Sequence, residues 1–286
     1  MKVFTFIFSF SLSILTCLIY GVLMIHQTAI IDKSAEIDKD VEIGPYAIIG
    51  KDVKIQSGTQ IGAFTVIEYA EIGKNCKIYS SAFIGTAPQD LKYKNEKTKI
   101  VIGNNCLVRE CVTLNRGTTA HGITEIGSNC MFQAYSHVGH DCIVGNNVIM
   151  SNAATLAGHV EVNDNAVISG LVAIHQFVRI GRFAMLGGGA MVPLDIPPFC
   201  QVQGDRAKLI GLNIVGLKRN GFTDKQVSDI KSAYKIVFNS GLTVIEAIDQ
   251  IIASNPSKEV KEFVEFIKNS KRGITRPGRT AEDDAE

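Results

Sequence analysis

Four of the six histidines in this chain fall between positions 137 and 175. They are His137, His140, His159 and His175, and Asp141 follows His140 directly. Imidazole is the usual general acid or base near neutral pH, and a neighbouring carboxylate can hold the ring in one orientation. A single surface histidine more often has no catalytic role. Four that converge on one place predict a functional site, provided that the fold brings them together.

The fold is indicated by an internal repeat, in which an aliphatic residue, Met or Phe recurs at every sixth position. One series runs from Ile31 to Ile67, and a second, one residue out of phase, starts at Ile72 and is unbroken from Ile126 to Val192. A helix needs apolar spacings of three and four, and an amphipathic strand a spacing of two, so neither explains this period. Short strands joined by sharp corners do explain it. Three hexads then form one triangular coil of about 18 residues, with successive coils about 4.8 Å apart.

Glycine often follows the aliphatic residue of a hexad, as at Gly44, Gly62 and Gly127. Glycine adopts backbone angles that are closed to other residues. We therefore expect these glycines to form the corners of the coils.

Coil arithmetic places the histidines together. Val138, Leu156 and Ile174 are spaced 18 apart and should stack in one column, and each of the four histidines lies within three residues of it. They should cluster along one edge over about 10 Å. Two other functions could use this scaffold. A zinc enzyme such as the β-helical carbonic anhydrases is a minor alternative, because their His-x4-His pair is missing here. A noncatalytic binding solenoid would not require Asp141 beside His140.

Two polar stretches interrupt the repeat, Gly85 to Val101 and Arg116 to Glu125. Interruptions of this kind loop out from one edge of a solenoid and commonly carry function. The chain has 29 basic and 28 acidic residues and a formal charge of +1, so no overall field attracts nucleic acid. We expect no nucleic-acid partner.

The hexads stop near Pro198, and helical spacing with two capping boxes, Thr223 with Gln226 and Thr243 with Glu246, takes over. The predicted fold class is mainly β. A parallel β-helix over residues 24–199 is followed by a small α-helical domain over residues 200–286 with an acidic tail.

Several segments resemble the UDP-N-acetylglucosamine O-acyltransferases, a family of hexapeptide-repeat acyltransferases. The resemblance spans Met24 to about Arg276, and its motifs are Gln89 to Tyr93, Ser136 to Cys142, Asn152 to Val160, Ile174 to Phe177 and Asn213 to Gly221. It implies that the β-helix winds left-handed and that the protein is a homotrimer with active sites between subunits. It implies that an (R)-3-hydroxyacyl chain moves from acyl carrier protein to the 3-hydroxyl of UDP-N-acetylglucosamine, the first step of lipid A biosynthesis.

The resemblance also assigns roles to the residues of this chain. His140 would be the general base, Asp141 its partner, and the backbone N–H of Gly158 would face the developing oxyanion. The substrate-binding residues would be Asp90, Lys92, His137, His159, His175, Gln176, Asn213 and Arg219. A thioester is already an activated acyl donor, so we expect neither a cofactor nor a metal.

In this family a residue between subunits limits the acyl chain, and the matching position here is Gly188. Glycine at this ruler position implies a long donor, of about fourteen carbons. Three positions depart from the family pattern: Asn115 replaces a histidine, Gln133 a methionine and Asn220 a basic residue. The first two leave open the acylation of a 3-amino analogue of the sugar. The third weakens the expected contact with the acidic carrier protein.

Residues 1–23 are apolar after Lys2 and nearly long enough to cross a bilayer. A signal peptide is disfavoured, because no small-residue cleavage site follows. UDP-sugars and acyl carrier protein are cytosolic, so the expected location is the cytoplasm. We favour a misassigned start, with translation beginning at Met24, over a membrane anchor that faces the cytoplasm.

Overall fold

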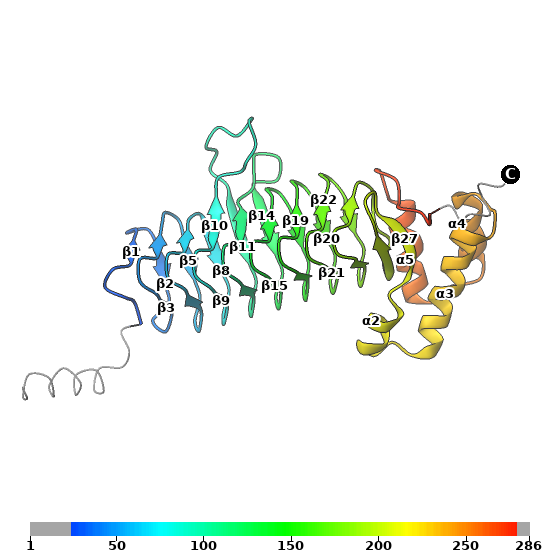
Figure 1. Ribbon diagram of the computed structural model, residues 1–286, viewed down its shortest axis with the longest axis horizontal. Helices are drawn as coiled ribbons and strands as arrows, with labels where there is room; N and C mark the ends of the chain where they lie inside the picture. Colours follow the sequence, from blue (N-terminus) through cyan, green and yellow to red (C-terminus); the bar gives the residue numbers. More distant parts are fainter. Residues whose placement is uncertain (1–23, 279–286) are drawn as a thin grey trace, which may run out of the picture.

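Most of the molecule is a long stack of triangular coils, with helices at one end (Figure 1). The computed structural model describes residues 24–278. The apolar extension at 1–23 and the acidic tail at 282–286 lie outside the described residues. Within them, strands 18 positions apart pair in parallel, for example Ile31 with Ile49 and Val138 with Leu156. The period of six and the coil of three hexads are therefore confirmed.

The described strands form three sheets, one for each side of the triangle. The nine-stranded sheet contains β1 (Ile30–Ile31), β4 (Ile48–Ile49), β7 (Val66–Ile67), β10 (Phe83–Thr86), β13 (Thr113–Asn115), β16 (His137–Val138), β19 (Thr155–Leu156), β22 (Ala173–Ile174) and β25 (Met191–Val192). The eight-stranded sheet contains β2 (Glu36–Ile37), β5 (Lys54–Ile55), β8 (Ala70–Ile72), β11 (Lys99–Ile102), β14 (Ile123–Ile126), β17 (Ile143–Val144), β20 (Glu161–Val162) and β23 (Arg179–Ile180). The ten-stranded sheet contains β3 (Glu42–Ile43), β6 (Gln60–Ile61), β9 (Lys77–Ile78), β12 (Leu107–Val108), β15 (Met131–Phe132), β18 (Ile149–Met150), β21 (Val167–Ile168), β24 (Met185–Leu186), β26 (Cys200–Gln203) and β27 (Lys208–Leu212).

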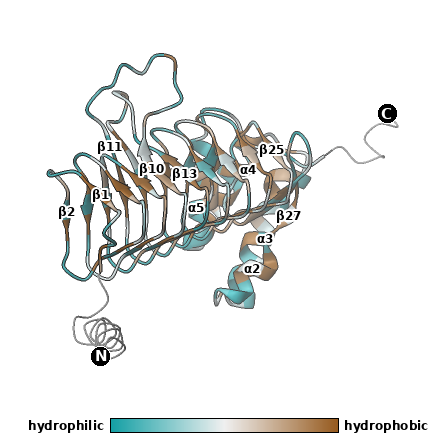
Figure 2. Cartoon of the chain, turned by 60° about the vertical axis from the view of Figure 1, so that its left-hand side comes forward, coloured by the Kyte–Doolittle hydropathy of each residue, from teal (hydrophilic) through white to brown (hydrophobic). Residues whose placement is uncertain are grey.

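The core is a stack of the hexad aliphatic residues. Val138, Leu156 and Ile174 are at most 3% exposed, and so are their equivalents on the other two sheets. Figure 2 shows the result as hydrophobic strands alternating with more polar corners. Ile31, in the first described coil, is 37% exposed, and no coil among residues 24–278 precedes it to cover it. Stacking identical layers buries each side chain against its neighbours above and below, which is how a strand of two residues becomes stable.

The expected reason for the hexad glycines is wrong. Residues with positive φ at the corners are mostly not glycine; Tyr135 and Asp141 are two examples, with φ of 64° and 58°. Gly62 and Gly127 are not among the positive-φ glycines. A Cβ on Gly62 would instead lie 2.6 Å from the backbone N of Ser80 in the next coil, and one on Gly127 would lie 2.6 Å from a backbone carbon. These glycines are needed for the close approach of successive coils.

The helical end consists of α2 (Ile214–Arg219), α3 (Asp224–Asn239), α4 (Val244–Ala253) and α5 (Lys258–Lys268). Both predicted capping boxes are present at the starts of α3 and α4. The change from strand to helix comes after the expected position 199, because β26 continues the ten-stranded sheet and β27 pairs with it in antiparallel fashion. The chain then returns to the solenoid, where Asp195 bridges Ile274 and Leu209 bridges Pro277.

Both interruptions of the repeat form loops on one side of the solenoid, next to β10 and β14 (Figure 1). The first loop runs from 87 to 98 and the second from 116 to 122. Across residues 24–278, every helix is too short or too polar to cross a membrane.

Candidate active site

The centre of the site is a hydrogen-bonded pair at the corner that follows β16. His140 Nδ1 lies 2.7 Å from Oδ2 of Asp141. An ionised carboxylate can only accept, so Nδ1 carries the proton and donates it. Nε2 of the neutral ring is then left with a free lone pair, and no residue between 24 and 278 hydrogen-bonds to it. The pair has the geometry of a general base and its orienting group.

Asp141 is held by the second loop. The backbone N–H of Thr118 donates to Oδ1 at 2.8 Å, and the Thr118 hydroxyl donates to Oδ2 at 2.7 Å. The backbone N–H of Asp141 donates to the Thr124 hydroxyl at 2.9 Å. Burial alone would raise the pKa of Asp141, but the hydrogen bonds from His140 and Thr118 hold this pKa below its usual value. The carboxylate therefore stays ionised at neutral pH, and its contribution to stability is lost only when the pH falls through that lowered pKa.

We expect Thr118→Val to lower kcat/KM by about tenfold, since a hydrogen bond to a charged group contributes about 1.5–3 kcal/mol and part of that orients the ring. Valine keeps the shape and the backbone N–H but removes the hydroxyl donor, so the pKa of Asp141 should rise. Thr65→Val is the matched control, because Thr65 is also buried and its hydroxyl donates to the carbonyl of Tyr79, a contact outside this site. Steady-state kinetics of the two variants provide the check, and equal activities would contradict the assignment.

A second imidazole completes the centre. The ring of His159 packs edge-on against His140 at 5.0 Å between centroids and stacks on Phe177 at 4.5 Å. Its Nε2 is 3.8 Å from Asp141 Oδ2. Burial lowers the pKa of His159, and the charge of Asp141 opposes this effect only partly. His159 is therefore neutral at pH 7 and can contact a substrate without competing for the carboxylate. His121, from the second loop, lies 5.6 Å from the His159 ring.

Gly158 lies directly under the His140 ring. A Cβ at this position would be 2.6 Å from His140 Cε1 and Nε2, so any side chain would displace the imidazole. Among residues 24–278 no backbone carbonyl accepts from the Gly158 N–H. A free donor next to the basic nitrogen is the arrangement that an oxyanion requires.

His140, Asp141 and His159 also place three potential ligand atoms within 4.8 Å of one another. A metal site could be built from such a set. Here, however, Oδ2 of Asp141 already accepts from His140 and from Thr118, and Nδ1 of His140 points at the carboxylate. The donor set therefore suits a hydrogen-bonded base better than a cation.

Three other expected substrate-binding residues lie on β16 and in the first loop. His137 lies on the outer face of β16, where Thr113 Oγ1 is 2.7 Å from its Nδ1; burial and then the nearby His140 lower its pKa. Asp90 and Lys92 lie in the first loop, where Asp90 Oδ1 accepts from the Lys92 backbone N–H at 2.9 Å. The Lys92 side chain is exposed.

The remaining predicted residues are further along the chain. His175 and Gln176 are exposed, and Nδ1 of His175 contacts the guanidinium of Arg272 at 2.7 Å. Asn213 is buried as the N-cap of α2: its oxygen accepts from Gly216 N–H, and its amide donates to the Phe183 carbonyl. Arg219 is exposed at the end of α2. In both views α2 lies on the opposite side of the solenoid from the first loop (Figures 1 and 2). A single chain therefore does not bring the expected binding residues of α2 close to those of the first loop.

A groove of about 690 Å³ extends from the centre toward the C-terminal segment. It begins at His159 and Phe177 and is lined by three basic side chains, Arg179, Lys271 and Arg272, and by two acidic ones, Glu161 and Asp195. Arg179 pairs with Glu161 at 3.1 Å, so the positive charge available to a phosphate-bearing substrate is that of Lys271 and Arg272.

Sequence reasoning did not find Thr118, His121 or Phe177. Thr118 and His121 come from the second loop, outside the repeat, so coil arithmetic could not place them. The sequence does show that this loop is inserted one coil before His140, which could have indicated that its residues lie near the site. Phe177 follows His175 at a corner with φ of 63°, and only the fold reveals its stacking on His159.

Three family models match this chain. Residues 195–275 match the family model described as UDP-N-acetylglucosamine O-acyltransferase domain 2. Residues 123–158 match the bacterial transferase hexapeptide model, and residues 25–122 match the GMPPB C-terminal domain.

Two relatives are named acyl-[acyl-carrier-protein]–UDP-N-acetylglucosamine O-acyltransferase. The protein of Anaeromyxobacter dehalogenans is 45% identical over 257 residues, which is 88% of this chain and 99% of that protein. The protein of Campylobacter concisus is 43% identical over 254 residues, covering 87% of this chain and 96% of that protein. Among solved structures, the UDP-N-acetylglucosamine acyltransferase of Francisella novicida superposes with a TM-score of 0.87 at 38% identity, covering 90% of this chain and 95% of that one. The enzyme of Campylobacter jejuni gives 0.85 at 40% identity, with 89% and 100% covered.

Proposed function

The chain belongs to the family of acyl-[acyl-carrier-protein]–UDP-N-acetylglucosamine O-acyltransferases, and on this premise we propose how its own residues carry out the transfer. The fold is the left-handed parallel β-helix of these enzymes with a small helical C-terminal region. The protein is an acyltransferase that moves an (R)-3-hydroxyacyl chain from acyl carrier protein to the 3-hydroxyl of UDP-N-acetylglucosamine, the first step of lipid A biosynthesis.

The observation that carries the mechanism is the 2.7 Å contact between His140 and Asp141, which leaves Nε2 free. In the first step Nε2 removes the proton of the sugar 3-hydroxyl as its oxygen attacks the thioester carbonyl. Asp141 stabilises the imidazolium that forms, because it is ionised and fixed by Thr118. A base placed in this way typically contributes a factor of about 10²–10⁴ in rate.

In the second step the tetrahedral intermediate collapses. Its oxyanion is stabilised by the N–H of Gly158, which lies beside the ring. The C–S bond breaks, and the imidazolium returns its proton to the departing thiolate of the carrier protein. The proton taken from the sugar hydroxyl is the one delivered to the thiolate, so no other acid or base is required.

None of these steps needs a metal, because the thioester is already activated. The test is release of free carrier thiol from a 3-hydroxyacyl carrier protein, followed with UDP-N-acetylglucosamine in metal-free buffer with a chelator. We expect an unchanged rate. A loss of activity that Zn²⁺ restores would favour the three-ligand set at His140, Asp141 and His159 over the hydrogen-bonded base.

Substrate contacts follow from the positions of the other residues. His159 packs against the ring of the base, and His137 is close enough to it for His140 to lower its pKa. Asp90 acts on the pKa of His159 and is hydrogen-bonded to the backbone of Lys92. We assign these four residues to the sugar nucleotide. In the groove next to His159, the side chains of Lys271 and Arg272 suit the phosphate groups of either substrate. UDP-sugars and acyl carrier protein are cytosolic, so we infer that the reaction takes place in the cytoplasm.

We also propose a homotrimer in which neighbouring chains share each site. Two observations support it. His175 and Gln176 lie on the solenoid, whereas Asn213 and Arg219 belong to the start and end of α2, away from the first loop (Figure 1). In addition, the nine-stranded sheet that carries His137 has exposed apolar side chains on its outer face and entry corner, namely Ile30, Ile48, Phe83, Met191, Tyr46, Phe64, Tyr135 and Leu171. An apolar column of this kind on a soluble surface marks a protein contact.

The trimer predicts a solution mass of three times the chain mass of 31.0 kDa. Light scattering coupled to size exclusion measures it directly. Tyr135→Glu should shift the mass toward the monomer, because Tyr135 is 67% exposed in one chain and lies at the entry corner of the sheet. Activity should fall with the trimer fraction. A monomer that retains full activity would overturn the shared site.

A further inference from the structure

The loop from 87 to 98 has little structure of its own. It contains no helix or strand, and Leu91 within it is fully exposed. It nevertheless carries Asp90 and Lys92, which must meet the sugar nucleotide at a defined place. Something outside the loop has to fix it.

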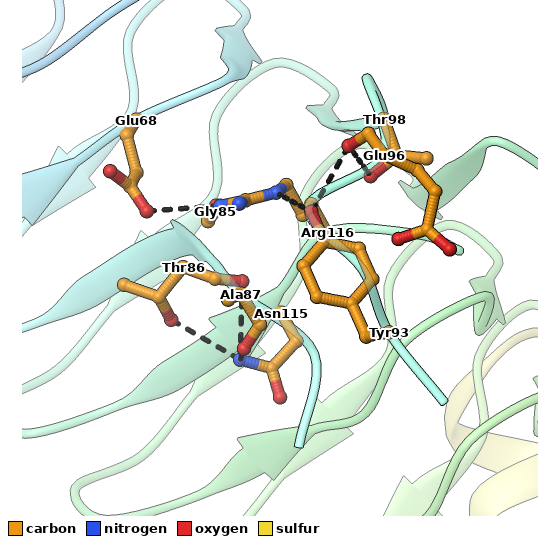
Figure 3. Close-up of polar contacts among 9 residues, drawn as sticks. All are labelled: Glu68, Gly85, Thr86, Ala87, Tyr93, Glu96, Thr98, Asn115 and Arg116. Atoms are coloured by element: carbon orange, nitrogen blue, oxygen red, sulfur yellow. Dashed lines mark hydrogen bonds and ion pairs between the residues drawn. The ribbon is translucent and has the colours of Figure 1, made fainter. Parts of the chain in front are cut away.

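Arg116, the residue after β13, contacts both strand β10, from which this loop leaves, and the interior of the loop. Its Nη1 donates to the carbonyl of Gly85 at 2.6 Å and to Glu68 Oε1 at 2.9 Å. Its Nε donates to the hydroxyl of Tyr93 at 2.9 Å. The guanidinium also packs over the rings of Tyr69 and Tyr93, at 4.5 and 5.4 Å from their centroids. Figure 3 shows the side chain between Glu68 on one side and Tyr93 on the other.

The loop continues this network. The Tyr93 hydroxyl donates in turn to the carbonyl of Glu96 at 3.1 Å, so one arginine fixes both arms of the loop. Asn115, the neighbour of Arg116, donates from its amide to the Thr86 hydroxyl at 3.2 Å and to the carbonyl of Ala87 at 3.2 Å. Figure 3 shows these contacts at the point where the loop leaves β10.

Arg116 is only 6% exposed, although it is charged. Burying a cation has a high desolvation cost unless its N–H groups form hydrogen bonds with protein acceptors. The planar guanidinium donates in three directions and stacks on two rings, which a lysine ammonium cannot do. The position thus demands arginine for its geometry and not only for its charge.

We propose that Arg116 is a positioning residue for acceptor binding, which holds the loop so that Lys92 and Asp90 face the sugar nucleotide. This inference rests on the proposed contacts of Lys92 and Asp90 with the substrate. Arg116 itself touches no reacting group. Its loss should therefore affect binding of the sugar nucleotide more than the chemical step.

The test compares Arg116→Lys with Arg109→Lys. Arg109 is a matched control, because it also pairs with a carboxylate, that of Glu110, and packs over a tyrosine ring, that of Tyr79, without contacting the loop. We expect Arg116→Lys to raise KM for UDP-N-acetylglucosamine about tenfold while kcat changes less than about threefold and the pH profile is unchanged. Arg109→Lys should leave both constants near the wild-type values. Tyr93→Phe, which removes only the loop hydroxyl, should give a smaller rise in KM.

A second readout does not depend on substrate binding. Limited trypsin digestion should cleave the loop at Lys92, Lys94 or Lys97 about tenfold faster in Arg116→Lys than in Arg109→Lys, at equal melting temperature. Faster cleavage with an unchanged KM would overturn the acceptor role while retaining the anchor. Unchanged cleavage, or a fall in kcat at constant KM, would overturn the proposal itself. If Lys92→Ala leaves KM unchanged, the assignment of Lys92 fails, and the digestion still tests whether Arg116 holds the loop.

Discussion

His140→Ala is expected to lower kcat/KM by about 10²- to 10⁴-fold, the range that a positioned general base contributes. The reason is local. The imidazole is the group whose Nδ1 is hydrogen-bonded to Asp141 and whose Nε2 is left to take a proton. Folding should be unaffected, because the side chain lies at a corner outside the stacked aliphatic core.

Melting temperature and solution mass of His140→Ala therefore form part of the measurement. His26→Ala is the matched control, since His26 is exposed and, within residues 24–278, its ring hydrogen-bonds only to Thr28. Asp141→Asn should be less active than wild type, because an amide cannot stabilise the imidazolium as a carboxylate does. Near-normal turnover of His140→Ala would remove this residue from the mechanism.

Gly188→Met is expected to change the preferred acyl donor from about fourteen carbons to about ten, a change of about a hundredfold in selectivity, because four buried methylenes contribute about 3 kcal/mol. Gly188 does not need to be glycine for backbone reasons. Its φ is not positive, whereas that of Gly189 is 72°, and a Cβ on Gly188 would have only an ordinary contact of 3.5 Å with the Gly170 carbonyl.

Competition between ten- and fourteen-carbon carrier-protein thioesters in one reaction measures this selectivity directly. Ile252→Met, at an exposed position of α4, is the control and should retain the wild-type preference. A wild-type enzyme that already prefers ten carbons would show that Gly188 is not the ruler. An unchanged preference in Gly188→Met would lead to the same conclusion.

Much of the fold was predictable because the repeat has a simple physical cause. Each coil must present an apolar residue to the same place in the next, so Val138, Leu156 and Ile174 recur at fixed spacing and indicate both the period and the column. The glycines were misinterpreted, since a sequence shows where Gly62 and Gly127 occur but not whether backbone angles or close packing require them. The capping boxes of the helical end were predictable because they are local.

The site was predictable only in part, because the period of the repeat places only the residues that belong to it. His140, Asp141 and His159 belong to the repeat, and coil arithmetic brings them together. Thr118 holds the carboxylate from a loop whose path no periodicity describes. Asn213 is buried as a helix cap, so its expected contact with the nucleotide remains a prediction, as does that of Arg219 on α2, which a second chain would have to bring to the centre.

We propose that the His140–Asp141 pair directs a 3-hydroxyacyl group onto one sugar oxygen. The most direct measurement is the structure of the product formed from UDP-N-acetylglucosamine and a 3-hydroxyacyl carrier protein, determined by mass spectrometry and NMR. We predict a single ester at the 3-oxygen, formed by the wild-type protein and lost with His140→Ala. An acyl group at another position, or the same ester formed at full rate by the variant, would contradict the account.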